Sequence, residues 1–98
     1  MKAPSYLSKN AKQWWKKLED QYEFTNDTYM LLITLLECFD EYQKARELLT
    51  KGGPLIKSKN GVIKKNPCIE LLKVSRSQFL ATWRLLGFNI SPPDGLRR

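Results

Sequence analysis

Apolar residues recur at three- and four-residue intervals along the central part of the chain, residues 26–50. This spacing places them on one side of an α-helix and the charged residues on the other. Thr25 can cap the start of the helix, and Gly52-Gly53-Pro54 favours its end, because glycine permits positive φ and proline cannot continue a helix. The main apolar stripe consists of Leu31, Leu35, Phe39, Tyr42, Ala45 and Leu49.

The first turns of this predicted helix are also apolar on the opposite side, and the last helix has a second, narrower apolar stripe. A helix that is apolar all round must be covered all round. We therefore expect further copies of the chain to cover these faces, and a closed cyclic oligomer would do so without forming filaments. The expected interface positions are Tyr29, Met30, Ile33, Leu36, Leu71, Val74 and Leu85.

Two further helices are predicted, at residues 9–22 and 67–86. Ser8 is a suitable cap for the first, Asn66-Pro67 suits the start of the other, and Gly87 suits its end. Trp14 and Trp15 fall on the apolar stripe of the first helix, which favours a place in the core over base stacking. The main stripe of the last helix is Ile69, Leu72, Phe79, Leu80, Trp83 and Leu86.

Residues 55–64 carry the pattern of a short β-hairpin. Asn60-Gly61 predicts a two-residue type I′ turn, because both residues tolerate positive φ. The flanking strands would be residues 55–58 and 62–64. The sequence thus predicts a mainly α fold of three helices with a hairpin between the second and third, in one domain of residues 1–90, followed by a short flexible tail, residues 91–98.

The net charge of +7 in 98 residues, with a pI near 9.6, favours an anionic partner. The charge is local: residues 23–50 hold six of the ten acids, whereas five lysines and no acid lie between Lys51 and Lys65. Lysines bind phosphates as point charges, and a side-chain amide can reach a base edge. The candidate DNA-binding residues are Lys57, Lys59, Asn60, Lys64 and Lys65 on the hairpin, and Lys9, Lys12 and Lys16 on the first helix.

The composition offers little for catalysis. Histidine is absent, which excludes histidine general bases and histidine metal ligands. Cys38 and Cys68 lack metal-ligand spacing and are expected to be small, reduced, apolar residues. Lys51-Gly52-Gly53 does not have the spacing of a phosphate-binding loop. We therefore expect no enzyme, metal or cofactor. The sequence also shows no signal peptide and no apolar run of membrane-spanning length, and we expect an intracellular protein.

Arg76 falls among the apolar positions of the last helix by helical spacing. A guanidinium there needs a carboxylate or carbonyl partner, because an unpaired buried charge is very costly. We expect a structural role for it, with an acid of the central helix or of a neighbouring copy as its partner. If the pair is buried, replacement by alanine should cost roughly 2–5 kcal/mol.

Several motifs together resemble the short small subunits of phage terminases. They are Leu7-Ser8 leading to Trp14-Trp15, the central helix followed by a basic loop, and a last helix with Asn66-Pro67 at its start, Arg76-Ser77-Gln78-Phe79-Leu80 in its middle and Leu86-Gly87-Phe88 at its end. The resemblance covers roughly residues 4–90.

The resemblance implies an oligomeric, non-catalytic, DNA-binding subunit that recognises viral DNA for packaging. It would recruit or regulate the large ATPase and nuclease subunit in the cytoplasm of the infected bacterial host. Its partners would be double-stranded viral DNA, the terminase large subunit and further copies of itself. Two other functions fit the residues alone: a free-standing regulator of the helix-turn-helix type, and a helical protein-interaction module whose lysines only keep it soluble.

Overall fold

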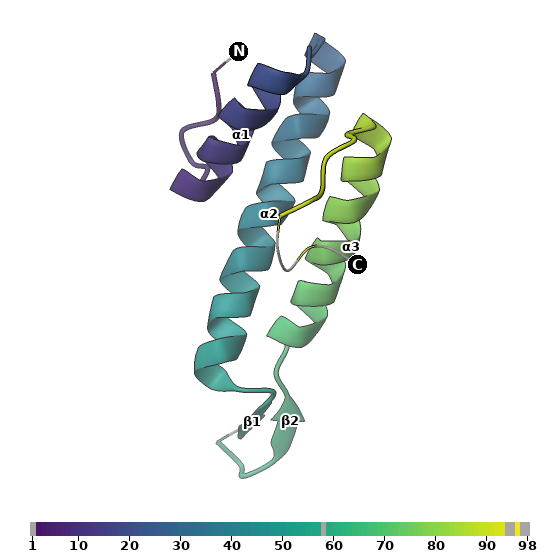
Figure 1. Ribbon diagram of the computed structural model, residues 1–98. Coiled ribbons are helices and arrows are strands. Elements are labelled where there is room, and N and C mark those ends of the chain that lie inside the picture. Colours follow the sequence, from purple (N-terminus) through teal and green to yellow (C-terminus); the bar gives the residue numbers. More distant parts are fainter. Residues whose placement is uncertain (1, 58, 94–95, 97–98) are drawn as a thin grey trace.

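The computed structural model describes residues 2–57, 59–93 and 96 of the chain. It confirms the predicted mainly α fold with a hairpin between the second and third helices (Figure 1). The molecule is elongated, at 53 × 27 × 21 Å. In chain order the elements are α1 (Lys9–Gln21), α2 (Asn26–Gly52), β1 (Leu55–Lys57), β2 (Ile63–Lys65) and α3 (Cys68–Leu86).

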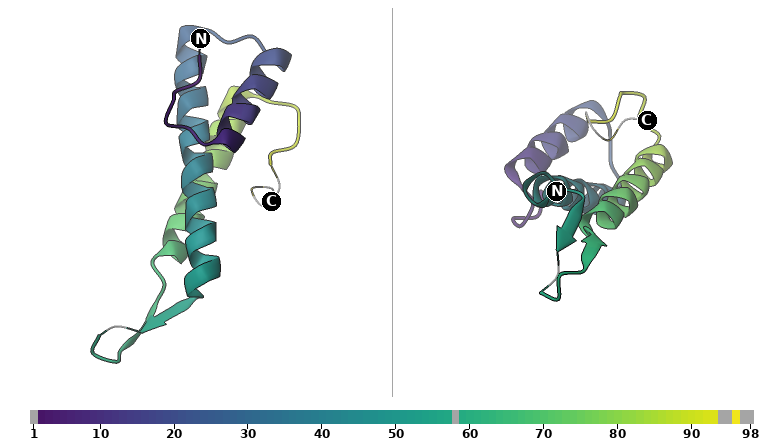
Figure 2. Two further views of the ribbon diagram at one scale, coloured as in Figure 1. Left: turned by 90° about the vertical axis from the view of Figure 1, so that its left-hand side faces the viewer. Right: turned by 90° about the horizontal axis from the view of Figure 1, so that it is seen from below.

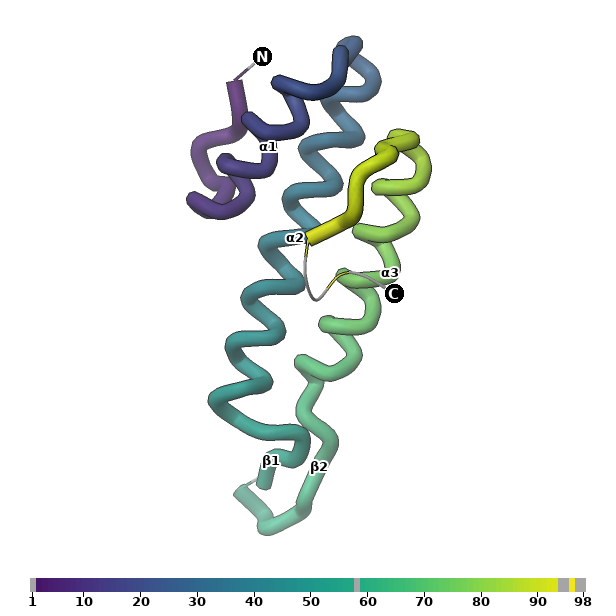
Figure 3. Tube along the Cα trace, in the orientation of Figure 1, coloured from purple at the N-terminus to yellow at the C-terminus, as the bar shows by residue number. Residues whose placement is uncertain are grey.

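Helix α2 is the axis of the fold. Helix α3 runs antiparallel beside it, and α1 packs against its N-terminal half (Figure 3). The hairpin projects beyond the ends of α2 and α3, away from α1 (Figures 1 and 2). The three helices therefore make the body, and the hairpin forms an arm at one end of it.

The helix ends follow the expected chemistry. The Ser8 hydroxyl accepts a hydrogen bond from the Ala11 amide at 3.1 Å and caps α1. Thr25 and Thr28 form a reciprocal capping box at the start of α2. Helix α2 continues to Gly52, two residues past its predicted end, and Gly53 follows with a φ of 76° that favours glycine.

The core lies where α1 and α3 meet α2. Phe79 is fully buried and stacks on Trp83, with ring centroids 5.5 Å apart. Trp15 is buried, and Trp14 packs edge-on against Trp83, so both tryptophans of α1 join the core as predicted. Cys38 is buried as well. The buried apolar cluster comprises Leu7, Ala11, Trp15, Leu18, Leu32, Leu35, Leu36, Cys38, Phe39, Tyr42, Phe79, Trp83 and Leu96.

The segment before α1 is tied to α2 through two of its acids. The Tyr6 hydroxyl donates to Glu37 at 2.9 Å, and Asp40 accepts bonds from both the amide and the hydroxyl of Ser8. Leu7 is buried between these polar contacts. Part of the charged face of α2 therefore serves to hold the N-terminal segment.

Residues 87–93, which follow α3, turn back over the helices (Figure 1). Leu96 is fully buried in the core cluster, and its amide donates to the Pro93 carbonyl at 3.1 Å. The prediction of a flexible tail from residue 91 did not foresee this contact. Residues 94, 95, 97 and 98 of that tail lie outside the described residues, and the domain boundary at residue 90 stays a prediction.

Candidate nucleic-acid interface

The hairpin exposes every described residue of both strands. Its cross-strand pairs are Leu55 with Lys65, Ile56 with Lys64, and Lys57 with Ile63, so each pair joins an aliphatic residue to a lysine. Paired residues share a face and successive residues alternate between faces. We call the face with Leu55, Lys57, Ile63 and Lys65 the Leu55 face, and the face with Ile56 and Lys64 the Ile56 face.

This register shows that the predicted two-residue turn is wrong. The register that pairs Lys57 with Ile63 places Asn60 alone at the centre of the connection, whereas a two-residue turn would have its centre between Asn60 and Gly61. A type I′ turn also requires positive φ at Asn60, whereas among the described residues only glycines, including Gly61 at 80°, have positive φ. Lys59 and Asn60 are exposed in this loop, as a contact with DNA would require. The expected Ser58 strand position lies outside the described residues.

Asn66 joins the base of the hairpin to both neighbouring helices. Its side-chain amide donates to the Gly53 carbonyl at 2.8 Å, and its side-chain oxygen accepts from the Cys68 amide at 3.0 Å. Its backbone amide donates to the Pro54 carbonyl at 2.9 Å. Asn66 is only 6% exposed, so these bonds form in a protected site. Asn66 was expected to cap α3, but the cap position is Pro67, which makes no side-chain capping bond. Asn66 lies one residue earlier, bonds to the first residue of α3 and closes the hairpin.

The second predicted patch is on α1, where Lys9, Lys12 and Lys16 are all exposed. Helix α1 packs on the N-terminal half of α2, whereas the hairpin extends past the other end of that helix (Figure 1). The structure thus separates the two predicted lysine patches along the long axis of the molecule.

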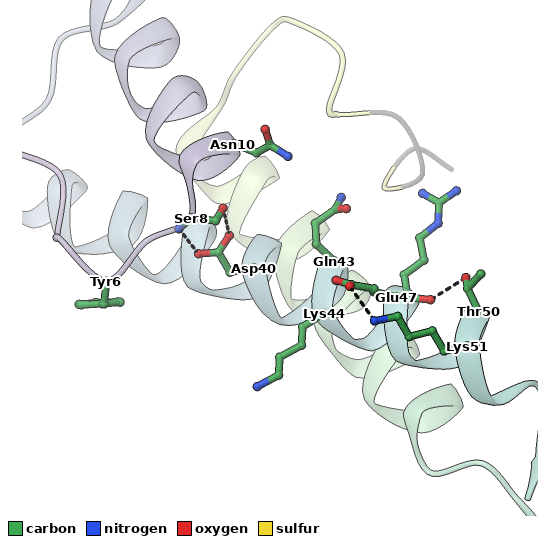
Figure 4. Close-up of a pocket in the computed structure, with 10 residues that line it drawn as sticks. Tyr6, Ser8, Asn10, Asp40, Gln43, Lys44, Glu47, Thr50 and Lys51 are labelled. Atoms are coloured by element: carbon green, nitrogen blue, oxygen red, sulfur yellow. Dashed lines mark hydrogen bonds and ion pairs between the residues drawn. The ribbon is translucent and has the colours of Figure 1, made fainter.

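A shallow groove between the start of α1 and the second half of α2 lies between these patches (Figure 4). Its cations are Lys44, Arg46 and Lys51, with Asn10, Gln43 and Thr50 alongside. The two acids of the groove are engaged: Asp40 binds Ser8, and Glu47 pairs with Lys51 at 3.3 Å. The sequence placed Lys44 on the charged face of the central helix and did not predict this groove, because the position of α1 beside it is a tertiary feature.

Comparison with known proteins identifies the family. The family model described as phage terminase, small subunit, matches residues 11–97. The chain belongs to the phage terminase small-subunit family. The family predicted from the sequence motifs is thereby confirmed, and the matched range includes α1 almost entirely, α2, the hairpin and α3. No curated protein and no solved structure matches the chain.

The predicted oligomer-interface residues of this small-terminase chain fall into two groups. Leu36 is buried in the core, and Tyr29 stacks on Trp15 of α1 with ring centroids 5.7 Å apart. Tyr29 also donates to Glu19 of α1 at 2.6 Å, so α1 of the same chain covers much of this side of α2. Ile33 is half-buried against the core. The remaining four, Met30, Leu71, Val74 and Leu85, are 61%, 44%, 44% and 69% exposed.

Leu36 was expected at the interface, but its side chain is buried in the core and is not at the surface of the chain. On the apolar side of α2 in its first turns, Tyr29, Ile33 and Leu36 gain their cover within one chain, whereas Met30 stays exposed. The exposed stripe of α3 has no such cover among the described residues, and its place in an oligomer interface stays a prediction.

The structure offers little for metal or nucleophilic chemistry in the part that it describes. No group of three metal-ligating side chains occurs among residues 2–57, 59–93 and 96. Burial raises the pKa of the Cys38 thiol, and the carboxylates of Glu41 and Glu37 raise it further. This thiol is therefore held in its protonated, weakly nucleophilic form. In the same described residues, no helix is long and apolar enough to cross a membrane.

Arg76 lies beside the most buried strip of α3, where Ser75 is fully buried and donates to the Leu71 carbonyl at 2.6 Å. Arg76 itself is half-buried next to Leu80. Because this position is less buried than predicted, we expect Arg76→Ala to lower the free energy of unfolding by only about 1–2 kcal/mol. Urea unfolding measures this loss. Parent-like unfolding combined with weaker DNA binding would make Arg76 a surface contact instead.

Proposed function

We propose that this chain is the DNA-binding, oligomeric small subunit of a phage terminase. It would recognise viral DNA for packaging, and recruit or regulate the large ATPase and nuclease subunit in the cytoplasm of the infected bacterial host. The observation that supports this most is the family match over residues 11–97. In this proposal the chain is not itself a catalyst, in keeping with its lack of histidine.

The distribution of cations supports a DNA surface along the molecule. Lysines occur on the hairpin, in the groove, where Figure 4 shows Lys44 and Lys51, and on α1. The hairpin, the second half of α2 and α1 follow one another from the arm to the body (Figure 1). Contacts of this type are mainly to phosphates and are sensitive to salt. A single chain would bind weakly, and several copies held together would bind more tightly through effective concentration.

Self-association is supported by the aliphatic residues that remain at the surface. Leu71, Val74 and Leu85 recur along α3 and are each at least 44% exposed. Contiguous exposed patches of this kind on a small domain mark interaction sites. An assembly of several copies would bury them and repeat the DNA surface.

The geometry argues against a helix-turn-helix regulator. That motif joins two helices at about 90–120° through a turn of three or four residues. Here α2 and α3 run antiparallel and are separated by a complete hairpin (Figure 1). A protein-interaction module without a nucleic-acid role is the second candidate. Titration with duplex DNA over a salt series separates it from the proposed function, because such a module would not bind DNA.

The test removes Lys59 and Lys64 together, as Lys59→Gln/Lys64→Gln. Lys64 is on the Ile56 face, away from Leu55 and Ile63, and Lys59 lies outside the paired strands. Each lost phosphate contact should reduce the slope of log K against log salt by about 0.9 on duplex DNA. We expect a flatter slope and lower affinity with an unchanged assembly, measured by fluorescence anisotropy over a salt series.

The matched control is Lys2→Gln/Lys73→Gln, which removes the same charge from exposed positions off the hairpin. It should keep a slope close to that of the parent. If the two double variants behave alike, the hairpin is not the DNA surface. If the parent itself shows no salt-dependent binding to duplex DNA, the proposed function fails.

A further inference from the structure

The hairpin has no hydrophobic core of its own. Its aliphatic residues Leu55, Val62 and Ile63 are 61%, 52% and 66% exposed, and Ile56 is 39% exposed. An isolated two-stranded hairpin is at best marginally stable in water, and this one projects from the body (Figure 2). DNA phosphates can bind its lysines but cannot bury its aliphatic side chains. The arm therefore requires an apolar surface to rest on.

The Leu55 face is the larger of its two faces. Leu55 and Ile63 lie diagonally across this face, with Lys65 and Lys57 at the other two corners. A surface that fits it must have aliphatic residues in the middle and acids beside them. The opposite Ile56 face pairs a single aliphatic residue with Lys64.

The exposed surface where α3 lies beside α2 has aliphatic residues with acids beside them. Along α3, Leu71, Val74, Gln78 and Leu85 follow helical spacing and fall on one side. The Cys38 thiol donates to the Gln78 side-chain oxygen at 3.7 Å, which places this side against α2. We call these four residues, together with the exposed Glu41 of α2, the α2–α3 face.

The acids beside the aliphatic stripe supply the charge complement. Glu41 is exposed and follows Cys38 by three residues on α2. Its carboxylate is near enough to raise the pKa of that thiol. Glu70, one residue before Leu71, is also exposed. The face itself contains no lysine or arginine, whereas the hairpin contains no acid.

We propose that the Leu55 face of the hairpin of one copy docks on the α2–α3 face of the next copy. Leu55 and Ile63 would pack on Leu71 and Val74, and the lysines would lie beside Glu41 and Glu70. Two different patches that fit one another make a head-to-tail contact, which closes into a ring when the rotation permits. The inference rests on the proposed self-association and assigns its interface. Lys59 and Lys64 remain outside the contact and available to DNA.

The test uses one defect on each side of the contact. Leu55→Ser/Ile63→Ser damages the arm, and Leu71→Ser/Val74→Ser damages the receiving face. Each variant alone should weaken assembly at least about tenfold, as loss of central interface residues typically does. Sedimentation velocity at micromolar concentration measures the assembly, and far-UV circular dichroism checks the helices. All four positions are exposed, so the fold should persist.

Mixing the two variants gives the decisive result. The intact arm of the face variant can dock on the intact face of the arm variant, so the mixture should form a heterodimer and nothing larger. A mixture that stays monomeric, or either variant assembling like the parent, overturns the inference. Ile56→Ser, on the other face of the same hairpin, should assemble like the parent, and dissociation by this variant also overturns it.

A charge exchange tests the same contact if a serine variant fails to fold. Glu41→Lys should weaken assembly, and adding Lys57→Glu/Lys65→Glu should restore it. Absence of restoration contradicts the inference. Failure of the proposed function looks different: the parent chain would then remain monomeric or would not bind duplex DNA, whereas failure of this inference leaves both properties intact.

Discussion

Replacing Phe79 with alanine is expected to lower the free energy of unfolding by about 3–5 kcal/mol. Phe79 is fully buried, stacks on Trp83 and faces Phe39 across the two long helices, with ring centroids 6.3 Å apart. Truncation would remove buried aromatic area and leave a cavity that a closely packed helix pair cannot fill. Small domains have only about 5–15 kcal/mol of stability in total, so the loss would be a large share of it.

Urea unfolding followed by circular dichroism measures this effect. Leu85→Ala is the matched control, because Leu85 belongs to the same helix and is 69% exposed. It should change the unfolding free energy of a dilute sample by less than about 0.5 kcal/mol. Similar losses in the two variants would show that Phe79 is not central to the core.

The helices could be predicted from the sequence because local signals decide them. Ser8 and Thr25 cap helices as expected, and the apolar spacing of α2 and α3 placed Phe39 and Phe79 correctly in the core. The family could also be predicted, since the residues that resemble it are spread over most of the chain, and the family model matches residues 11–97.

What the sequence did not predict depends on contacts between distant segments. Leu36 is buried in the core, and Tyr29 packs on Trp15 of α1. The periodicity of a helix shows that a second apolar face exists but not which element packs on it. Ser75 and Arg76 are neighbours on α3, and their positions in the apolar spacing are similar. The packing of α3 on α2 decides that Ser75, and not Arg76, is fully buried. The burial of Leu96 has no periodic signal, because this residue lies in a short proline-containing segment after α3.

The candidate DNA residues were predicted from charge alone, and their arrangement depended on register. The Asn60-Gly61 signal favoured a two-residue turn, yet the register centres the connection on Asn60, and Gly61 has the positive φ among the residues described there. This register places Lys64 on one face and Lys57 with Lys65 on the other. Lys64 is therefore expected to contact DNA, and Lys57 and Lys65 are expected to contact a second copy, although these lysines look equivalent in the sequence.

Replacing Asn66 with alanine is expected to lower the free energy of unfolding by about 2–3 kcal/mol, through loss of two protected hydrogen bonds. The side chain of Asn66 holds the Gly53 carbonyl at the end of α2 and the Cys68 amide at the start of α3. Alanine would leave both groups without these partners. The hairpin base would open, and exchange of hairpin amides with solvent would accelerate.

Asn66→Asp separates the two bonds. Aspartate keeps an oxygen that can accept from the Cys68 amide but has no donor for the Gly53 carbonyl, so it should cost less than alanine. Asn60→Ala, at the exposed loop, should stay within about 0.5 kcal/mol of the parent. Urea unfolding and amide hydrogen exchange measure the series. If Asn66→Ala exchanges and unfolds like the parent, the hairpin is held by its strands alone. If the expected order is found, Asn66 fixes the direction of the arm, and its loss should weaken every contact that the arm makes.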